Sequence, residues 1–403
     1  MFTNRYVRTI ILSRVFLQLG IWIRNFAVLL YVTEITNNDP HYVSLISVVE
    51  FGPIFLFAII GGTFADRWKP KRTMVWSDLL SAVSVVAVII ALVMGHWVGL
   101  LLGTLVSASL SQFSQPSAMK LYKKHVPNEQ LQSVMAFSQS LVAIFTIIGP
   151  VVGTFIFVQF GITVSLVLTL VFFMLSAVIL SLLPRDAEEG KLQNSGSFLS
   201  EMKAGIQYMW ANRSLRTLSA TFAATGLASG MIQPLLIFIT MEQLGQDKQF
   251  IQWLLMANGA AMLIGGIALM GMTKKVRPQV LLATGLLVSA ICTVIVGAST
   301  SVVLSVTLQV VSGLFYPCVQ GGIQALIVRN TKAEFMGRVG GAITPVFMGM
   351  MVIGMSVSGY LKDLFSLFAV YAASGALLII GVLLLTPLLR ESSPKRQEVS
   401  GMQ

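Results

Sequence analysis

Apolar stretches of about 20 residues recur along nearly the whole chain, and each is long enough to cross a bilayer core of roughly 30 Å as an α-helix. Backbone polar groups in lipid must be satisfied within the segment, which a helix does and an open strand does not. The chain has 403 residues, of which 55% are hydrophobic and 11% are charged, whereas a soluble domain carries about 25% charged residues. The sequence therefore predicts an all-α integral membrane protein.

The apolar stretches and the polar breaks between them predict twelve transmembrane helices, arranged as two pseudo-symmetric six-helix bundles. The longest polar interval, residues 183–216, separates the first six spans from the last six. We expect an N-terminal bundle (1–184), a linker that holds an amphipathic helix or serves as a plain connector (185–214), a C-terminal bundle (215–389) and a tail (390–403). The expected spans are 8–32, 43–64, 73–94, 98–119, 132–157, 162–183, 215–240, 250–272, 279–298, 302–327, 337–360 and 366–388.

Basic residues are distributed unevenly between the two sides of these spans. Of the 27 Lys and Arg residues, 23 lie in the terminal segments and the even-numbered connections, and only Lys248 and Lys362 lie in the odd-numbered ones. Because short cytoplasmic loops are enriched in Lys and Arg, both termini and the linker are predicted to be cytoplasmic, in a cell (plasma) membrane of bacterial type. The net charge of +11 follows from this topology and does not indicate a nucleic-acid partner.

The two halves resemble each other in sequence. An aromatic and proline-containing segment around Pro116 leads into a basic loop and a helix of small residues, and the same order follows Pro317. Parallel repeats of this kind occur in transporters that rock one half against the other around a site near the membrane midplane. The duplication therefore favours a transporter over a non-transporting receptor or scaffold, which would not need it.

A charged segment, "GGTFADRWKPKR", joins the second and third predicted spans. Its glycines allow close helix packing, its acid can accept hydrogen bonds from a neighbouring helix N-terminus, and its bases can pair with the other half or with anionic lipid. Such a group can act as a conformational latch, whereas a merely basic loop would explain the bases but not the order of residues. The latch candidates are Gly62, Asp66, Arg67, Lys71 and Arg72.

This segment resembles the second-loop motif of the major facilitator superfamily, G-x-x-x-D-R-x-G-[RK]-[RK], with Lys69 and Pro70 where a Gly-Arg is usual. The basic run after "ADRW" is similar to the macrolide-efflux-like and enterobactin-exporter-like branch of drug:proton antiporters. The resemblance in span number, linker and repeat covers the whole chain. It implies a secondary transporter whose substrate path is lined by spans one, four, seven and ten.

A second match, "GPVVG", lies in the fifth predicted span and resembles the core of the antiporter motif of this superfamily, G-x-x-x-G-P-x-x-G-G. Gly149, Pro150 and Gly153 fit this motif, whereas Phe145 and Thr154 occupy two of its glycine positions. The match favours export. The alternative is a proline kink of the kind common in membrane helices.

Apart from basic residues at the very ends of spans, four charged residues fall inside predicted spans, where a charge costs at least ~2.5–3.5 kcal/mol. Glu50 and Arg24 lie at similar depth on consecutive antiparallel helices and can pair. Glu50 is then either a carboxylate that exchanges a proton during transport or half of a permanent ion pair, and Arg24 alternatively recognises an anionic substrate. Asp78 and Arg14 form a similar pair nearer to the cytoplasm, for which a structural role is favoured. All four are candidates for proton coupling.

Amide and aromatic side chains occur on the spans that the resemblance places around the substrate path. An apolar cavity with a few neutral polar contacts suits a bulky amphipathic molecule, although the same side chains also serve ordinary helix packing. The cavity candidates are Trp22, Asn25, Tyr31, Gln112, Phe113, Gln115, Gln233, Phe315, Tyr316 and Gln320.

The chain carries no P-loop, zinc-protease or serine-hydrolase motif, and Cys292 and Cys318 lie in apolar segments without metal-ligand spacing. We therefore expect no enzyme, cofactor or metal, and energy supplied by an ion gradient. The sequence predicts a monomeric, proton-coupled efflux transporter whose partners are a small amphipathic substrate, protons and membrane lipids. An uptake or lipid-translocating transporter of the same superfamily is the alternative.

Overall fold

The computed structural model describes residues 4–65, 68–184, 198–272, 276–332 and 335–390, and within these ranges the chain forms helices and no β-strand. The helices of the N-terminal half are α1 (Arg5–Ile35), α2 (Pro40–Ala65), α3 (Pro70–Val93), α4 (Gly99–His125) and α5 (Asn128–Ser181). Asn4 caps α1 by accepting a hydrogen bond from the backbone N–H of Tyr6 at 2.9 Å. The 54-residue helix α5 is interrupted at Gly161, whose φ of +76° is open to glycine and strained for other residues.

The C-terminal half begins with α6 (Phe198–Ala211) and α7 (Arg213–Ile232). α7 is followed, after a bend of 45°, by α8 (Leu236–Phe238) and the π-helical turn η1 (Ile239–Gln243). The bend contains Pro234, which cannot continue the hydrogen-bond ladder of the helix. The remaining elements are η2 (Lys248–Phe250), α9 (Ile251–Met272), α10 (Pro278–Ala298), α11 (Val302–Asn330), α12 (Met336–Leu364), α13 (Leu367–Leu384) and α14 (Thr386–Arg390).

Nine helices of the described residues are long and apolar enough to cross a membrane, and the bent α7–η1 pair makes a tenth. In this count α5 enters once, although Gly161 divides it into two arms, and the serine- and glutamine-rich α4 does not enter. Counting both arms of α5 and adding α4 gives the twelve predicted segments. The number twelve thus depends on α4 and on the break in α5, and hydropathy alone does not fix it.

The exterior of the bundle is apolar and its interior contains small residues. Val83, Val93 and Ile267 are each more than half exposed, whereas Thr169 and Ser176 between the helices are fully buried. In a membrane protein the lipid solvates such an apolar exterior, and small residues allow the helices to approach closely. The described residues therefore form a multi-pass, all-α membrane protein.

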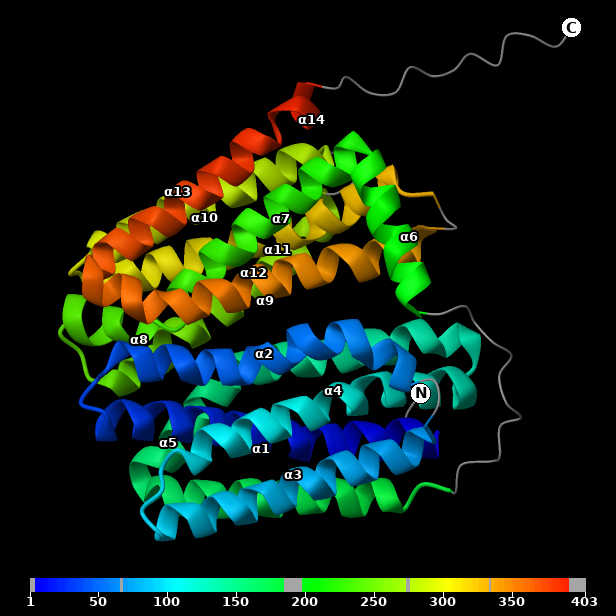
Figure 1. Ribbon diagram of the computed structural model, residues 1–403, viewed down its shortest axis with the longest axis vertical. Coiled ribbons are helices and arrows are strands. Elements are labelled where there is room, and N and C mark those ends of the chain that lie inside the picture. Colours follow the sequence, from blue (N-terminus) through cyan, green and yellow to red (C-terminus); the bar gives the residue numbers. More distant parts are fainter. Residues whose placement is uncertain (1–3, 66–67, 185–197, 273–275, 333–334, 391–403) are drawn as a thin grey trace, which may run out of the picture.

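Figure 1 shows the two halves stacked on each other. The helices α6 and α14 and the first residues of α1 lie at the same end of the bundle, which we call the linker end. At the opposite end, which we call the far end, the two halves share one buried apolar cluster that includes Phe26, Leu30 and Val43 of the first half with Leu235 and Phe238 of the second. α2 packs against α12 and α5 against α9 across this boundary. The two halves therefore close directly on each other at the far end.

The helix α6 packs against the start of α12 at the linker end (Figure 1). The ring of Tyr208 stacks on that of Phe335 with centroids 4.4 Å apart. A Cβ added to Gly205 would lie 2.3 Å from the carbonyl oxygen of Arg338, so only glycine allows this approach. Within the predicted linker, the described residues thus form a helix fixed to the C-terminal half.

Candidate functional site

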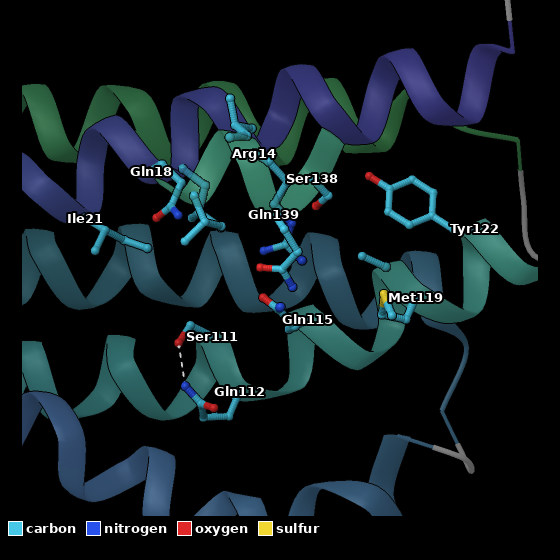
Figure 2. A pocket seen from close by; sticks show the side chains of 14 residues that line it. Arg14, Gln18, Ile21, Ser111, Gln112, Gln115, Met119, Tyr122, Ser138 and Gln139 are labelled. Carbon is cyan, nitrogen blue, oxygen red and sulfur yellow. Dashed lines mark hydrogen bonds between the residues drawn. The ribbon is translucent and has the colours of Figure 1, made fainter. Parts of the chain in front are cut away.

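A polar cavity of about 390 Å³ lies inside the N-terminal half, between α1, α4 and α5. Figure 2 shows side chains from these three helices pointing into it. α1 contributes Arg14 and Gln18, and the remaining polar lining of the cavity consists of Ser111, Gln112, Gln115, Tyr122, Ser138 and Gln139.

Helical spacing explains which residues reach this cavity. Arg14, Gln18 and Ile21 follow one another on one face of α1, because residues three or four apart in a helix share a face. Ser111 and Gln115 repeat the pattern on α4, as Ser138 and Val142 do on α5. The cavity is thus a property of three helix faces and not of any loop.

Sequence reasoning identified part of this lining. Gln112 and Gln115 were expected in the cavity, but Gln18, Ser138 and Gln139 were not. The lining combines apolar side chains, among them Leu17 and Met119, with amides, and in addition to the neutral contacts expected it includes the guanidinium of Arg14. The signal that could have found the missing residues is the run of polar side chains on one face of α1 and at 138–139 within an otherwise apolar span.

Arg14 and Asp78 are held by other partners and form no ion pair with each other within the described residues, contrary to our expectation. Nη2 of Arg14 donates to the carbonyl oxygen of Ser114 at 2.9 Å. The carboxylate of Asp78, only 2% exposed, accepts a hydrogen bond from the hydroxyl of Ser176 at 2.6 Å. The charge of Asp78 acts on Arg14 at longer range, and Arg14 lines the cavity.

Arg24 and Glu50 are connected through Asn25 and not directly. Nε and Nη2 of Arg24 donate to the amide oxygen of Asn25 at 3.1 and 2.8 Å. The amide nitrogen of Asn25 in turn donates to Oε1 of Glu50 on α2. We call this chain of three residues the Arg24–Asn25–Glu50 relay. It places Asn25, predicted as a cavity residue, between the two charges that were predicted to pair.

The other predicted cavity residues lie in both halves and are not among the residues that line this cavity. Trp22 packs with Phe26, Tyr31 packs on an apolar cluster of the N-terminal half, and Phe113 lies against Phe57 and Trp68. In the C-terminal half, the amide of Gln320 donates to the hydroxyl of Tyr316 at 2.8 Å, Gln233 is exposed at the end of α7, and Phe315 is half-buried on α11. The described residues contain no group of three His, Cys, Asp or Glu that could hold a metal ion.

The antiporter-like motif on α5 packs against α1. A Cβ added to Gly149 would lie 2.4 Å from the indole ring of Trp22, and one added to Gly153 would lie 2.7 Å from the carbonyl oxygen of Trp22. Pro150 lies between the two glycines within the helix. The two glycines thus allow the backbones of α1 and α5, which both line the cavity, to approach each other closely.

Replacing Gly153 by alanine is expected to destabilise the protein, since overpacking against a backbone atom costs about 1–3 kcal/mol. The matched control is Gly266→Ala on α9, where nothing lies within 4 Å of the added Cβ. Thermal unfolding of the purified proteins in detergent should give a lower midpoint for Gly153→Ala than for the parent and for Gly266→Ala. Equal midpoints for the two variants would contradict the close packing described here.

The latch candidates are described only in part. Asp66 and Arg67 lie outside the described residues, Gly62 belongs to α2, and Lys71 and Arg72 begin α3. The ammonium group of Lys71 donates to the carbonyl oxygens of Ser181, at 2.8 Å, and Leu183. These contacts tie α3 to the end of α5 within the N-terminal half.

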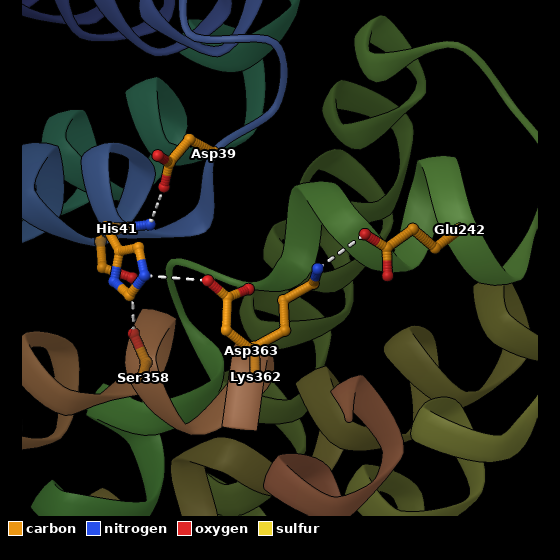
Figure 3. A network of polar contacts seen from close by, with 7 residues as sticks. Asp39, His41, Glu242, Ser358, Lys362 and Asp363 are labelled. Atoms are coloured by element: carbon orange, nitrogen blue, oxygen red, sulfur yellow. Dashed lines mark hydrogen bonds and ion pairs between the residues drawn. The ribbon is translucent and has the colours of Figure 1, made fainter. Parts of the chain in front are cut away.

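The far end carries polar contacts between the two halves (Figure 3). Nε2 of His41 on α2 lies 2.8 Å from Oδ2 of Asp363 on α12, and Lys248 lies 2.9 Å from Glu34 at the end of α1. Beneath them, the hydroxyls of Ser44 and Ser358 are buried and 2.8 Å apart. Exposed ion pairs stabilise by only about 0–1 kcal/mol, so the buried apolar cluster contributes most of the free energy that holds the two halves together at the far end. The polar pairs determine which residues of the two halves face each other.

These features define a polytopic all-α membrane protein with two helical halves, a cavity between helices of the first half and a closed far end. The chain belongs to the MFS_3 family, described as transmembrane secretion effector, whose family model matches residues 1–400.

Relatives and solved structures agree with this family. The chain is 24% identical to macrolide efflux protein A of Streptococcus pyogenes over 92% of both chains, and 23% identical to the multidrug efflux pump Tap of Mycolicibacterium fortuitum over 88% and 89% of the two chains. The fold is similar to a crystal structure of a mutant of the nucleoside transporter NupG, with a TM-score of 0.78, 10% identity and coverage of 96% of this chain and 100% of that one. The predictions of a major facilitator transporter of the macrolide-efflux-like branch, and of a transporter in place of an enzyme, are confirmed.

Proposed function

We propose that the chain exports amphipathic drug-like or secondary-metabolite molecules in exchange for protons, by alternating access between residues 1–184 and 215–389. The protein is a monomer in the plasma membrane with both termini in the cytoplasm, so the far end faces outward. The excess of Lys and Arg at the linker end supports this orientation. The names of the efflux relatives support the direction of transport.

One observation carries the proton coupling: the Arg24–Asn25–Glu50 relay lies within membrane-spanning helices and contains one carboxylate. A carboxylate at this depth needs a partner or a function, because an isolated charge there costs at least ~2.5–3.5 kcal/mol. Asn25 can continue to hold Glu50 after the carboxyl group has taken up a proton, since one oxygen remains an acceptor. The relay therefore suits a group that changes charge without losing its position.

A conformational role follows from where the relay lies. Arg24 and Asn25 are on α1, which lines the polar cavity through Arg14 and Gln18, and Glu50 is on α2, which packs against α12 of the other half. A change in the charge of Glu50 thus acts on one helix of the cavity and on one helix of the contact between halves. This is the connection that an exchanger requires between its ion and its substrate.

The proposal is tested with inside-out membrane vesicles in which the proton gradient is established from outside. Fluorescent amphipathic cations, neutral molecules and anions are offered in turn, with and without a protonophore, and vesicles lacking the protein give the background. We expect accumulation of at least one probe inside the vesicles that the protonophore abolishes. Accumulation that persists with the protonophore would exclude proton coupling. Accumulation only in right-side-out vesicles would assign uptake, and none of any probe would contradict a drug-like substrate.

A further inference from the structure

The polar cavity presents donors of hydrogen bonds and one positive charge. Its lining residues include no aspartate or glutamate, whereas Arg14 brings a guanidinium, and Gln18, Gln115 and Gln139 bring primary amides. Arg14 uses Nη2 for the carbonyl oxygen of Ser114 and makes no ion pair within the part of the chain that the structure describes. A guanidinium has five N–H donors, so most of its donor capacity remains for a ligand.

The acid whose charge reaches Arg14 is Asp78, which is not among the lining residues. Its carboxylate is buried and accepts a short hydrogen bond from Ser176, away from the cavity lining. On the opposite side, α4 ends beyond Met119 and Tyr122 of the lining with Lys123, Lys124 and His125. Arg14 is the one charged side chain among the lining residues, with the carboxylate of Asp78 outside the lining and the basic end of α4 beyond it, and this arrangement favours an anion in the cavity.

We propose that this cavity binds the carboxylate, or a comparable anionic group, of an amphipathic molecule that the protein transports, with Arg14 as the charged donor and the three amides as neutral ones. The inference rests on the proposed function and narrows its substrate class. A cavity of about 390 Å³ lies near the lower end of the range of about 300–1,000 Å³ that pockets for drug-sized ligands cover. Apolar residues of the lining, among them Leu17, Ile21 and Met119, can contact the atoms next to the anionic group.

A guanidinium suits this role better than a structural one. A purely structural arginine in a membrane protein is expected to be paired with an acid or fully bonded to backbone oxygens. Arg14 has one such backbone bond, feels the charge of Asp78 without forming an ion pair with it in the described residues, and lies on the wall of the cavity (Figure 2). Arginine also matches the geometry of a carboxylate through two parallel hydrogen bonds.

The test measures binding, without a gradient, of three probes that share one ring system: pyrenebutyrate, its uncharged methyl ester and a pyrenylalkylamine. The protein is placed in phosphatidylcholine nanodiscs, and binding is followed by energy transfer from tryptophan to pyrene, with empty nanodiscs as background. We expect the parent to bind pyrenebutyrate about tenfold or more tightly than the ester, as charge-assisted hydrogen bonds imply. Equal affinity for the two would overturn the proposal.

Variants assign the preference to Arg14. Arg14→Gln should lose about tenfold in affinity for pyrenebutyrate and little for the ester, and Arg14→Lys should lose less. The matched control is Arg8→Gln, which removes a charge from an exposed position of the same helix and should change neither affinity. A loss of the same size for all three probes would make Arg14 a structural residue and overturn the assignment.

A second variant keeps the test decisive if Arg14→Gln does not fold. Gln18→Glu places a carboxylate in the cavity and should weaken pyrenebutyrate binding while it leaves the ester unchanged; an unchanged ratio would contradict an anion site. If phosphatidylglycerol in the nanodiscs displaces pyrenebutyrate, the occupant is an anionic lipid head group and the assignment to transported substrate is wrong. Binding can be measured without transport. If the vesicle experiment shows no transport but Arg14-dependent binding of pyrenebutyrate persists, the proposed function is wrong and the anion-binding site stands.

Discussion

Replacing Glu50 by glutamine is expected to abolish accumulation of the transported probe against its gradient in energised inside-out vesicles. Glutamine retains an oxygen that can accept the hydrogen bond from Asn25, so the relay keeps its geometry, but the side chain has no proton to exchange. The variant should therefore behave like a protein in which this position is permanently neutral. We expect at least about a tenfold loss of gradient-driven accumulation, in line with removal of an essential proton-transfer group.

Two comparisons make this result specific. Glu129→Gln removes a carboxylate from an exposed position in the first turn of α5 and should leave accumulation unchanged. Exchange of labelled for unlabelled probe, measured without a gradient, should persist in Glu50→Gln because it requires movement but no net proton transfer. If Glu50→Gln accumulated probe as well as the parent, and still lost that accumulation with a protonophore, Glu50 would be structural and another group would carry the proton.

The sequence placed Arg24 and Glu50 at similar depth on adjacent antiparallel helices, and the structure brings both to the same amide. The sequence could not predict that the side chain of Asn25 lies between Arg24 and Glu50. Rise per residue fixes the depth of a side chain, but the rotation of one helix about its axis against another depends on packing. For the same reason the expected Arg14 and Asp78 pair is absent among the described residues, because Ser114 and Ser176 offer partners closer to each.

The fold was easier to predict than the site. Long apolar runs define helices without reference to tertiary contacts, and Gly161 lies in the gap where a break between two spans was expected. The cavity, in contrast, needs the relative rotation of three helices, so α5 with Ser138 and Gln139 was missed while Gln112 and Gln115 of α4 were found. The superfamily resemblance implied that spans one, four, seven and ten line the substrate path. The candidate residues on spans seven and ten do not line this cavity.

Joining Ser44 to Ser358 by a disulfide is expected to stop transport. The two hydroxyl oxygens lie 2.8 Å apart on α2 and α12, in a buried contact between the two halves at the far end, so paired cysteines there lie within reach of the S–S distance of about 2.05 Å. If the far end must open in each cycle, as alternating access requires, a covalent bond across it holds the protein in one state. Oxidation of Ser44→Cys with Ser358→Cys should then remove nearly all probe accumulation, and a reductant should restore it.

The single variants Ser44→Cys and Ser358→Cys, oxidised in the same way, separate cross-linking from damage. The parent provides the background for the natural thiols, Cys292 and Cys318, which are both buried. The Arg14-dependent binding of pyrenebutyrate should survive the cross-link, because the residues that line the cavity belong to α1, α4 and α5, whereas the cross-link joins α2 to α12. Full transport by a protein shown by mass spectrometry to be cross-linked would mean that the far end stays closed throughout the cycle. The cavity would then exchange its ligand by a route other than rocking of the two halves.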